Sequence, residues 1–78
     1  MTRRLDLTGL KCPLPVLRAR KALRGMQKGE RLEVIATDPM AAIDIPNMLR
    51  ESGDILLASS RDGTVLIFEI ERGSIGGN

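Results

Sequence analysis

Hydrophobic residues in the first half of the chain form two alternating runs on either side of a run with helical spacing. The segment Leu5–Thr8 alternates apolar and polar residues, as a half-buried strand does. From Leu14 to about Gly25, apolar residues recur at intervals of three and four, which predicts an amphipathic helix. The segment Arg31–Thr37 contains several β-branched residues and alternates again, so it predicts a second strand.

A second helix is predicted after this strand. Asp38 is a typical N-cap residue, and Pro39 fits the first helical position, so we expect the helix to begin there and to end before Gly53. Pro46 lies inside the pattern and removes a backbone donor, so we expect a bend or a break between Asp44 and Pro46, with Asp44 capping the restarted turn. The methionines of this segment are expected in the core: Met40 and Met48.

Two further strand-like runs close the chain, Asp54–Ser60 and Thr64–Glu71, with Arg61-Asp62-Gly63 between them as a hairpin turn. The predicted order is therefore β-α-β-α-β-β. Because parallel β-α-β crossovers are right-handed, both helices should cover one face of the sheet. The sequence thus predicts an α/β two-layer sandwich with a mixed four-stranded sheet. We expect one domain over residues 1–78, ordered over about 3–72, with a flexible tail over 73–78.

The composition narrows the chemistry open to this chain. Among its 78 residues, Phe68 is the sole aromatic, Cys12 the sole cysteine, and histidine is absent. One cysteine cannot form an internal disulfide, and without histidine there is neither a Cys–His catalytic arrangement nor a zinc-ligand set. We therefore expect no metal and no cofactor. Because we find neither a signal peptide nor an apolar run long enough to span a membrane, we expect a cytoplasmic protein.

Charge is distributed unevenly along the chain. Up to Arg31, nine basic and two acidic residues give +7, whereas from Leu32 onward three basic and eight acidic residues give −5. The net charge of +2 therefore hides a bipolar molecule whose positive half contains the cysteine. On the polar face of the first predicted helix, Arg18, Lys21 and Arg24 are candidates for docking an acidic partner, although such a face is also typical of a plain solvated surface.

Cys12 is the strongest candidate for chemistry. It lies in Gly9-Leu10-Lys11-Cys12-Pro13-Leu14-Pro15, where the first strand passes into the first helix. A thiolate there would face the helix N-terminus with Lys11 beside it, and together these lower the pKa by at most about 1.5 units. The alternative is a buried cysteine that acts as a small hydrophobe. An exposed, solitary thiolate can accept a group and hand it on, and Lys11 is placed to pair with a persulfide anion.

The stretch Leu7–Val16 closely resembles the TusA/SirA-like sulfur-carrier family, whose mark is a Cys-Pro-X-Pro motif after the first strand. The resemblance covers about Arg3 to Arg72. Its later landmarks are Gly29-Glu30, Asp38-Pro39, Asp44-Ile45-Pro46, Ser52-Gly53 and the closing strand from Val65 to Glu71. It implies the same β-α-β-α-β-β sandwich, a persulfide carried on Cys12, and a shaping role for Pro13 and Pro15. Asp38 and Asp44 match positions that look structural, as caps of the second helix, and Asp44 could also touch partners.

This resemblance predicts a sulfurtransferase that accepts a sulfane sulfur on Cys12 and relays it to another protein. The implied partners are a sulfur donor, such as a cysteine desulfurase or a rhodanese-like protein, and a downstream acceptor. Two departures from the family pattern leave the pathway open: Leu14 stands between the prolines, where the best-known tRNA-thiolation member is acidic, and Asp54 stands where many relatives have histidine.

Two other interpretations remain open at this point. A compact sandwich with a basic half could be a small RNA-binding module, but the lack of stacking aromatics and the acidic second half argue against nucleic-acid binding. A thiol-based regulatory protein, with Cys12 as a redox sensor, is the other alternative.

Overall fold

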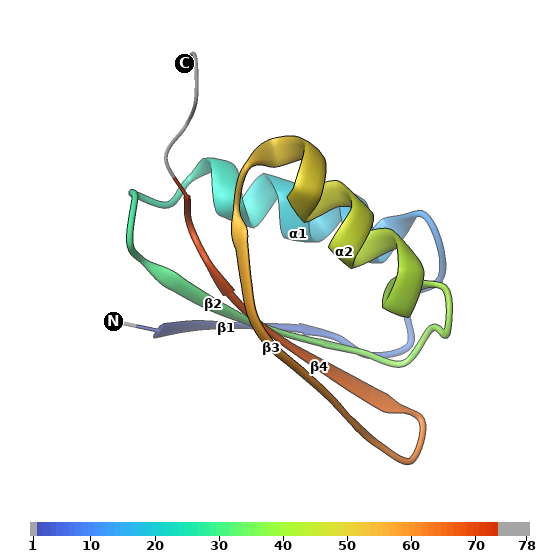
Figure 1. Ribbon diagram of the computed structural model, residues 1–78. Coiled ribbons are helices and arrows are strands. Elements are labelled where there is room, and N and C mark those ends of the chain that lie inside the picture. Colours follow the sequence, from blue (N-terminus) through green and yellow to red (C-terminus); the bar gives the residue numbers. More distant parts are fainter. Residues whose placement is uncertain (1, 74–78) are drawn as a thin grey trace.

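The predicted element order is confirmed in the computed structural model, which describes residues 2–73 (Figure 1). Two helices alternate with the first strands, and a hairpin closes the chain. The elements are β1 (Thr2–Leu7), α1 (Leu14–Arg24), β2 (Arg31–Ala36), α2 (Ala41–Ser52), β3 (Ile55–Asp62) and β4 (Val65–Glu71). Neither helix in this part of the chain is long and apolar enough to cross a membrane.

The sheet is mixed, as predicted, with the strand order β1-β2-β4-β3. β1 and β2 are parallel and joined through α1, whereas β4 runs antiparallel to both β2 and β3. Both helices lie on the same face of the sheet, and none of the described elements covers the opposite face (Figure 1). The carboxyl ends of β1 and β2 therefore meet at one edge of the sandwich, and each leads there into the turn before a helix.

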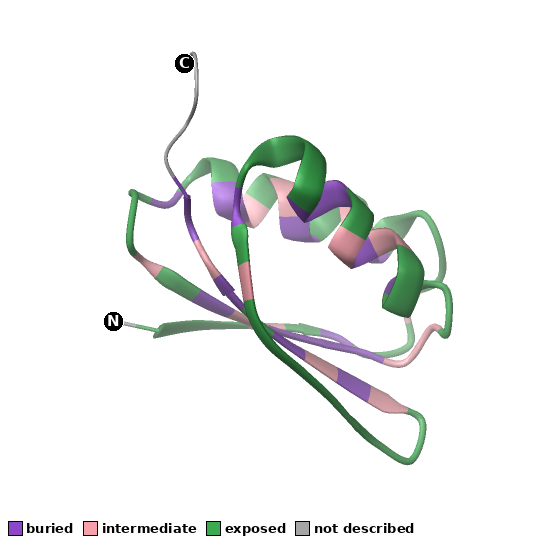
Figure 2. Cartoon of the chain, in the orientation of Figure 1, coloured by how far each residue is buried: buried purple, intermediate pink, exposed green. Residues whose placement is uncertain are grey.

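The core lies between the helices and the sheet. In β2 and β4 the residues that face the helices alternate with more exposed ones, as the pleat requires (Figure 2). Ala19 and Leu23 of α1 and Ile45 and Leu49 of α2 are almost fully buried against them. The strand residues of this core are Leu7, Leu32, Val34, Ala36, Leu66, Phe68 and Ile70. This aliphatic core fixes both helices over the sheet, and with them the loops at their N-termini.

The strand boundaries differ from the prediction where pairing recruits polar residues. β1 begins at Thr2 rather than Leu5, because its backbone pairs with β2 from Thr2 onward, and Arg4 forms an ion pair with Glu33 at 3.4 Å. β3 continues to Asp62, beyond the predicted end at Ser60. The hairpin turn therefore consists of Gly63 and Thr64 instead of Arg61-Asp62-Gly63. Gly63 has φ of +62°, at the position where a type II′ turn favours glycine.

α2 begins later than predicted. Its first residue is Ala41, because Asp38 and Pro39 form a tighter turn whose carbonyls accept from the N–H groups three residues ahead. Asp38 accepts from the N–H of Met40 at 3.2 Å but also from a more distant residue, described below. The prediction of a buried Met40 is wrong, since this residue ends the turn and its side chain is 46% exposed. Met48, which lies within α2, is buried as predicted.

The predicted break in α2 does not occur, because the helix runs continuously through Pro46. The carbonyl that loses its donor belongs to Ala42, which is an exposed residue. Burial of Ile45 and Leu49 holds the helix on the sheet on both sides of the proline. Asp44 therefore caps no restarted turn, and its carboxylate is available for a different contact.

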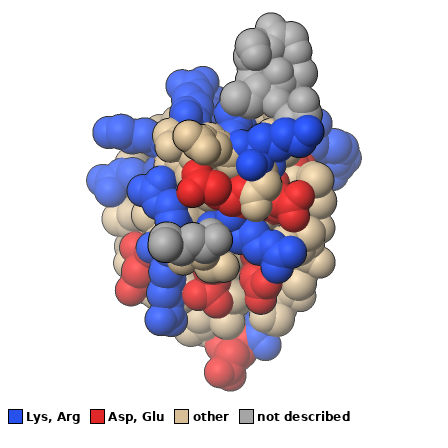
Figure 3. Space-filling view, turned by 90° about the vertical axis from the view of Figure 1, so that its left-hand side faces the viewer, with Lys and Arg blue, Asp and Glu red and all other residues tan. Residues whose placement is uncertain are grey.

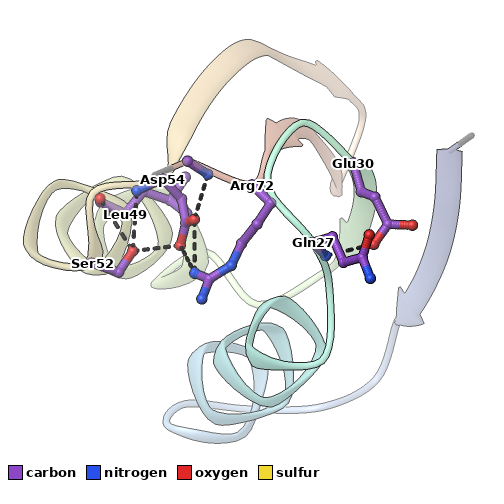
Figure 4. Close-up of polar contacts among 7 residues, drawn as sticks. Gln27, Glu30, Leu49, Ser52, Asp54 and Arg72 are labelled. Atoms are coloured by element: carbon purple, nitrogen blue, oxygen red, sulfur yellow. Dashed lines mark hydrogen bonds and ion pairs between the residues drawn. The ribbon is translucent and has the colours of Figure 1, made fainter. Parts of the chain in front are cut away.

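A buried ion pair ties the end of β4 to the start of β3. Arg72 Nη1 donates to both carboxylate oxygens of Asp54, at 2.9 and 3.2 Å, and Ser52 Oγ donates to the same carboxylate at 2.7 Å (Figure 4). The N–H of Gly73 donates to Asp54 as well, at 2.9 Å. Gly73 was expected in a loose tail but is buried here; the remaining tail residues, 74–78, lie outside the described residues.

Candidate functional site

Cys12 is exposed and lies in the loop between β1 and α1, immediately before the first turn of α1. This loop is closed by a hydrogen bond from the N–H of Leu14 to the carbonyl of Lys11 at 2.8 Å. The N–H of Gly9 is held from outside the loop by Thr37 Oγ1 at 2.9 Å. The alternative of a buried cysteine is therefore wrong, and the thiol is accessible at one edge of the sandwich.

Asp38 fixes the backbone of Cys12. Its Oδ2 accepts from the N–H of Cys12 at 2.5 Å, while its Oδ1 accepts from the N–H of Met40. One carboxylate thus joins the loop after β1 to the turn after β2. The Cys12–Pro13 peptide bond is cis. The prediction that Asp38 is the N-cap of α2 is wrong, because Met40 takes that position. Asp38 instead positions the candidate nucleophile, through a contact between residues far apart in the sequence.

Asp44 approaches the thiol from α2. Cys12 Sγ donates to Asp44 Oδ2 at 3.4 Å, and this hydrogen bond is the main cause that raises the pKa of Cys12. Desolvation and the charges of Asp44 and Asp38 raise the pKa further. The predicted lowering of this pKa is wrong, because two carboxylates act on the thiol and one of them accepts its hydrogen bond.

The thiol lies at one end of a groove between α1 and α2. The part nearest the thiol is a small cleft lined by Cys12, Pro13, Pro15, Val16, Asp38, Ala41 and Asp44. Beyond it the groove widens and is lined by Pro13, Val16, Arg20, Asp44, Asn47, Met48 and Glu51. Pro15 is buried in the first turn of α1, whereas Pro13 precedes the helix and is exposed. The cleft nearest the thiol has no room for a small molecule, so the arrangement can present the sulfur atom to another macromolecule.

The basic candidates lie along α1, and only one end of that helix is near Cys12. Arg18, Lys21 and Arg24 are all exposed, and the last two belong to the final turn. At about 1.5 Å per residue, Arg24 lies about 15 Å along the axis from Leu14. Figure 3 views the molecule from the side where α1 ends, and Lys and Arg side chains gather there. Since salt screens exposed charges over about 8 Å, Arg24 adds little to the potential at the thiol.

Lys11 is exposed beside Cys12, and the hydrogen-bond partner found for the thiol is Asp44. Sequence reasoning placed Asp38 and Asp44 in the second helix region but missed their contacts with Cys12. No local pattern signals these contacts, because 26 and 32 residues separate the two aspartates from the cysteine. Within residues 2–73 no cluster of three or more His, Cys, Asp or Glu side chains is suited to a metal ion.

Comparison with known proteins gives a consistent result. A family model described as "Sulfurtransferase TusA" matches residues 3–72. A putative sulfur carrier protein of Neisseria meningitidis is 57% identical over 60 residues, which cover 76% of this chain and 81% of that protein. Sulfur carrier protein TusA of Allochromatium vinosum is 43% identical over 68 residues, which cover 87% and 90%. The crystal structure of a SirA-like protein from Desulfitobacterium hafniense, 26% identical, superposes with a TM-score of 0.80 over 95% of this chain and 100% of that one.

Proposed function

We propose that this chain, which belongs to the TusA sulfurtransferase family of sulfur carriers, holds a sulfane sulfur as a persulfide on Cys12. It then relays this sulfur between proteins. The observation that carries the proposal is the exposed thiol at the narrow end of the α1–α2 groove. It is the chain's only cysteine, so no second thiol in the same chain can resolve a persulfide into a disulfide.

The loading step needs no oxidant. Cys12 Sγ bonds to the outer sulfur of a donor persulfide R–S–S⁻, the donor's S–S bond breaks, and its electron pair stays on the inner sulfur. The proton of the Cys12 thiol ends on that inner sulfur, which leaves as R–SH and yields Cys12–S–S⁻. Unloading is the same exchange with an acceptor thiol R′–SH. The acceptor sulfur bonds to the outer sulfur of Cys12–S–S⁻, the S–S bond at Cys12 breaks, and the acceptor's proton ends on Cys12 Sγ, which leaves the sulfur on the acceptor as R′–S–S⁻. The protein contributes position and exposure, which suits a carrier better than an enzyme with many turnovers on a small molecule.

Exposed apolar residues that lie close in the chain to Cys12 or to its carboxylate partners, here called the apolar rim, support a protein as the partner. Leu14 and Leu17 on α1 are 40% and 49% exposed, and Met40 and Ile43 at the start of α2 are 46% and 57% exposed. Large aliphatic side chains grouped beside a reactive atom are typical of a docking surface. In this proposal the rim contacts the donor and the acceptor in turn, in the cytoplasm, where thiols stay reduced.

The basic residues of α1 complete the proposed docking surface. Arg18 is close enough to the rim to contact the same partner, whereas Lys21 and Arg24 would contact it only if its surface extends along the whole helix. Lys11 is proposed to pair with the persulfide anion once it forms, and Pro13 and Pro15 to shape the loop that presents Cys12.

The test is intact-mass analysis after incubation with a cysteine desulfurase and cysteine, or with polysulfide. Wild-type protein should gain the mass of one or more sulfur atoms, lost again on reduction, and Cys12→Ser should gain none. Lys11→Ala should load more weakly, and Arg61→Ala, an exposed arginine in the β3–β4 hairpin, serves as the matched control. A wild-type chain that stays unmodified with every donor would refute the carrier role.

A further inference from the structure

Two carboxylates from different segments converge on Cys12. Asp44 is half-buried in the first turn of α2, and its Oδ2 accepts from Cys12 Sγ at a distance of 3.4 Å between the two atoms. Asp38, in the turn after β2, accepts from the backbone N–H of Cys12. Among the other charged residues, Lys11 is the neighbour of Cys12 in the chain, and Arg20 and Glu51 line the wider part of the groove together with Asp44. Within residues 2–73, the charged side chains that form hydrogen bonds with Cys12 are therefore both negative.

This arrangement affects the two chemical states of the carrier differently. The neutral thiol can donate to the carboxylate of Asp44, whereas the persulfide anion has no proton to donate and is repelled. The raised pKa of the thiol agrees with this geometry. In the exchange between Cys12–SH and a donor persulfide, the carboxylate therefore favours the unloaded side.

We infer that Asp44 is a positioning residue that holds the free Cys12 thiol protonated at the narrow end of the α1–α2 groove and biases the loaded carrier toward giving its sulfur away. The inference rests on the proposed sulfur-carrier function and adds a role for a second residue. A carrier that bound sulfur too stably would not pass it on, and an unprotected thiolate would be open to oxidation. One carboxylate at hydrogen-bond distance from Sγ addresses both problems.

The variant Asp44→Asn tests this inference, because the amide keeps the shape and a hydrogen-bond acceptor but removes the charge. The matched control is Asp62→Asn, the same exchange at an exposed residue at the end of β3. The first readout is the pH profile of Cys12 alkylation by iodoacetamide, which a merely structural role would not move. Asp44→Asn should react about three to ten times faster than wild type near neutral pH, because removing a negative charge lowers the thiol pKa. Asp62→Asn should match wild type.

The second readout is the loaded fraction at equilibrium in a fixed mixture of glutathione persulfide and glutathione, measured by intact mass. Asp44→Asn should be loaded to a larger extent than wild type, again by about three to ten times in the equilibrium constant. Unchanged alkylation and loading in a folded Asp44→Asn would overturn the inference. If no variant acquires sulfur, the carrier function fails while the alkylation profile still decides the role of Asp44 in holding the proton. Asp44→Glu, which restores the charge, should return the alkylation rate toward the wild-type value.

Discussion

The buried pair formed by Arg72 and Asp54 should dominate the response of this fold to single charge removals. The two side chains are only 8% and 1% exposed, and the Asp54 carboxylate accepts from Arg72, Ser52 and Gly73. Replacing Arg72→Met leaves that carboxylate buried without its cation. Removing one partner of a buried pair costs about 3–5 kcal/mol, because the remaining charge keeps its desolvation penalty and loses its counterion.

This cost is large for a chain of 78 residues. At about 0.05–0.15 kcal/mol per residue, the whole domain has a free energy of unfolding of about 4–12 kcal/mol. Arg72→Met should therefore remove about a quarter or more of it. The backbone of Arg72 also forms hydrogen bonds with Gly29 and Glu30 in the loop between α1 and β2. Displacing Arg72 would therefore weaken its contacts both with this loop and with Asp54 before β3.

The assay is urea unfolding followed by far-ultraviolet circular dichroism, since the chain has no tryptophan or tyrosine for fluorescence. The matched control is Arg31→Met, which removes a surface ion pair with Glu71 at 3.9 Å whose partners are 57% and 31% exposed. Exposed pairs contribute about 0–1 kcal/mol, so the control should be nearly neutral. The double variant Arg72→Met/Asp54→Asn should regain about 1–2 kcal/mol relative to Arg72→Met. If Arg72→Met is as mild as Arg31→Met, the reasoning is wrong.

Three further predictions concern the site and its supports. Asp38→Ala should lower the unfolding free energy by about 1 kcal/mol and slow persulfide loading of Cys12, because two backbone N–H groups lose their acceptor. Urea unfolding measures the first effect and intact mass the second, and an unchanged loading rate would contradict the positioning role of Asp38. The folded-state pKa of Cys12 is raised above its unfolded value of about 9.0, so the thiol's contribution to stability is present below that value and is lost as pH rises through the folded pKa. The unfolding free energy of wild type relative to Cys12→Ser should therefore decline at alkaline pH. A constant difference would show that the carboxylates do not act on the thiol. Gly73→Ala should cost about 1–3 kcal/mol in urea unfolding, since a Cβ there would overlap the Gly53 carbonyl, while Gly25→Ala, whose Cβ would meet its nearest atom at 3.7 Å, should not destabilise.

Local patterns were enough to predict the architecture. The alternation of apolar and polar residues in Arg31–Thr37 and the helical spacing from Leu14 can be identified from residues close together in the chain. The burial of Leu23, Val34 and Phe68 follows from these patterns. The handedness of the β-α-β crossover then placed both helices on one face. The errors fall where pairing or packing overrode a local preference: β1 extends to Thr2 because β2 offers backbone partners, and α2 passes through Pro46 because its flanking side chains are anchored in the core.

The sequence by itself determined that any chemistry of a thiol must use Cys12, and that this residue precedes a helix. Tertiary structure alone decided the electrostatic surroundings of the thiol. Asp38 and Asp44 reach Cys12 only because parallel β1 and β2 end at the same edge of the sheet and α2 packs beside α1. A helix N-terminus and a neighbouring lysine can be identified from adjacent residues, but contacts across 26 and 32 residues depend on how separate elements pack together.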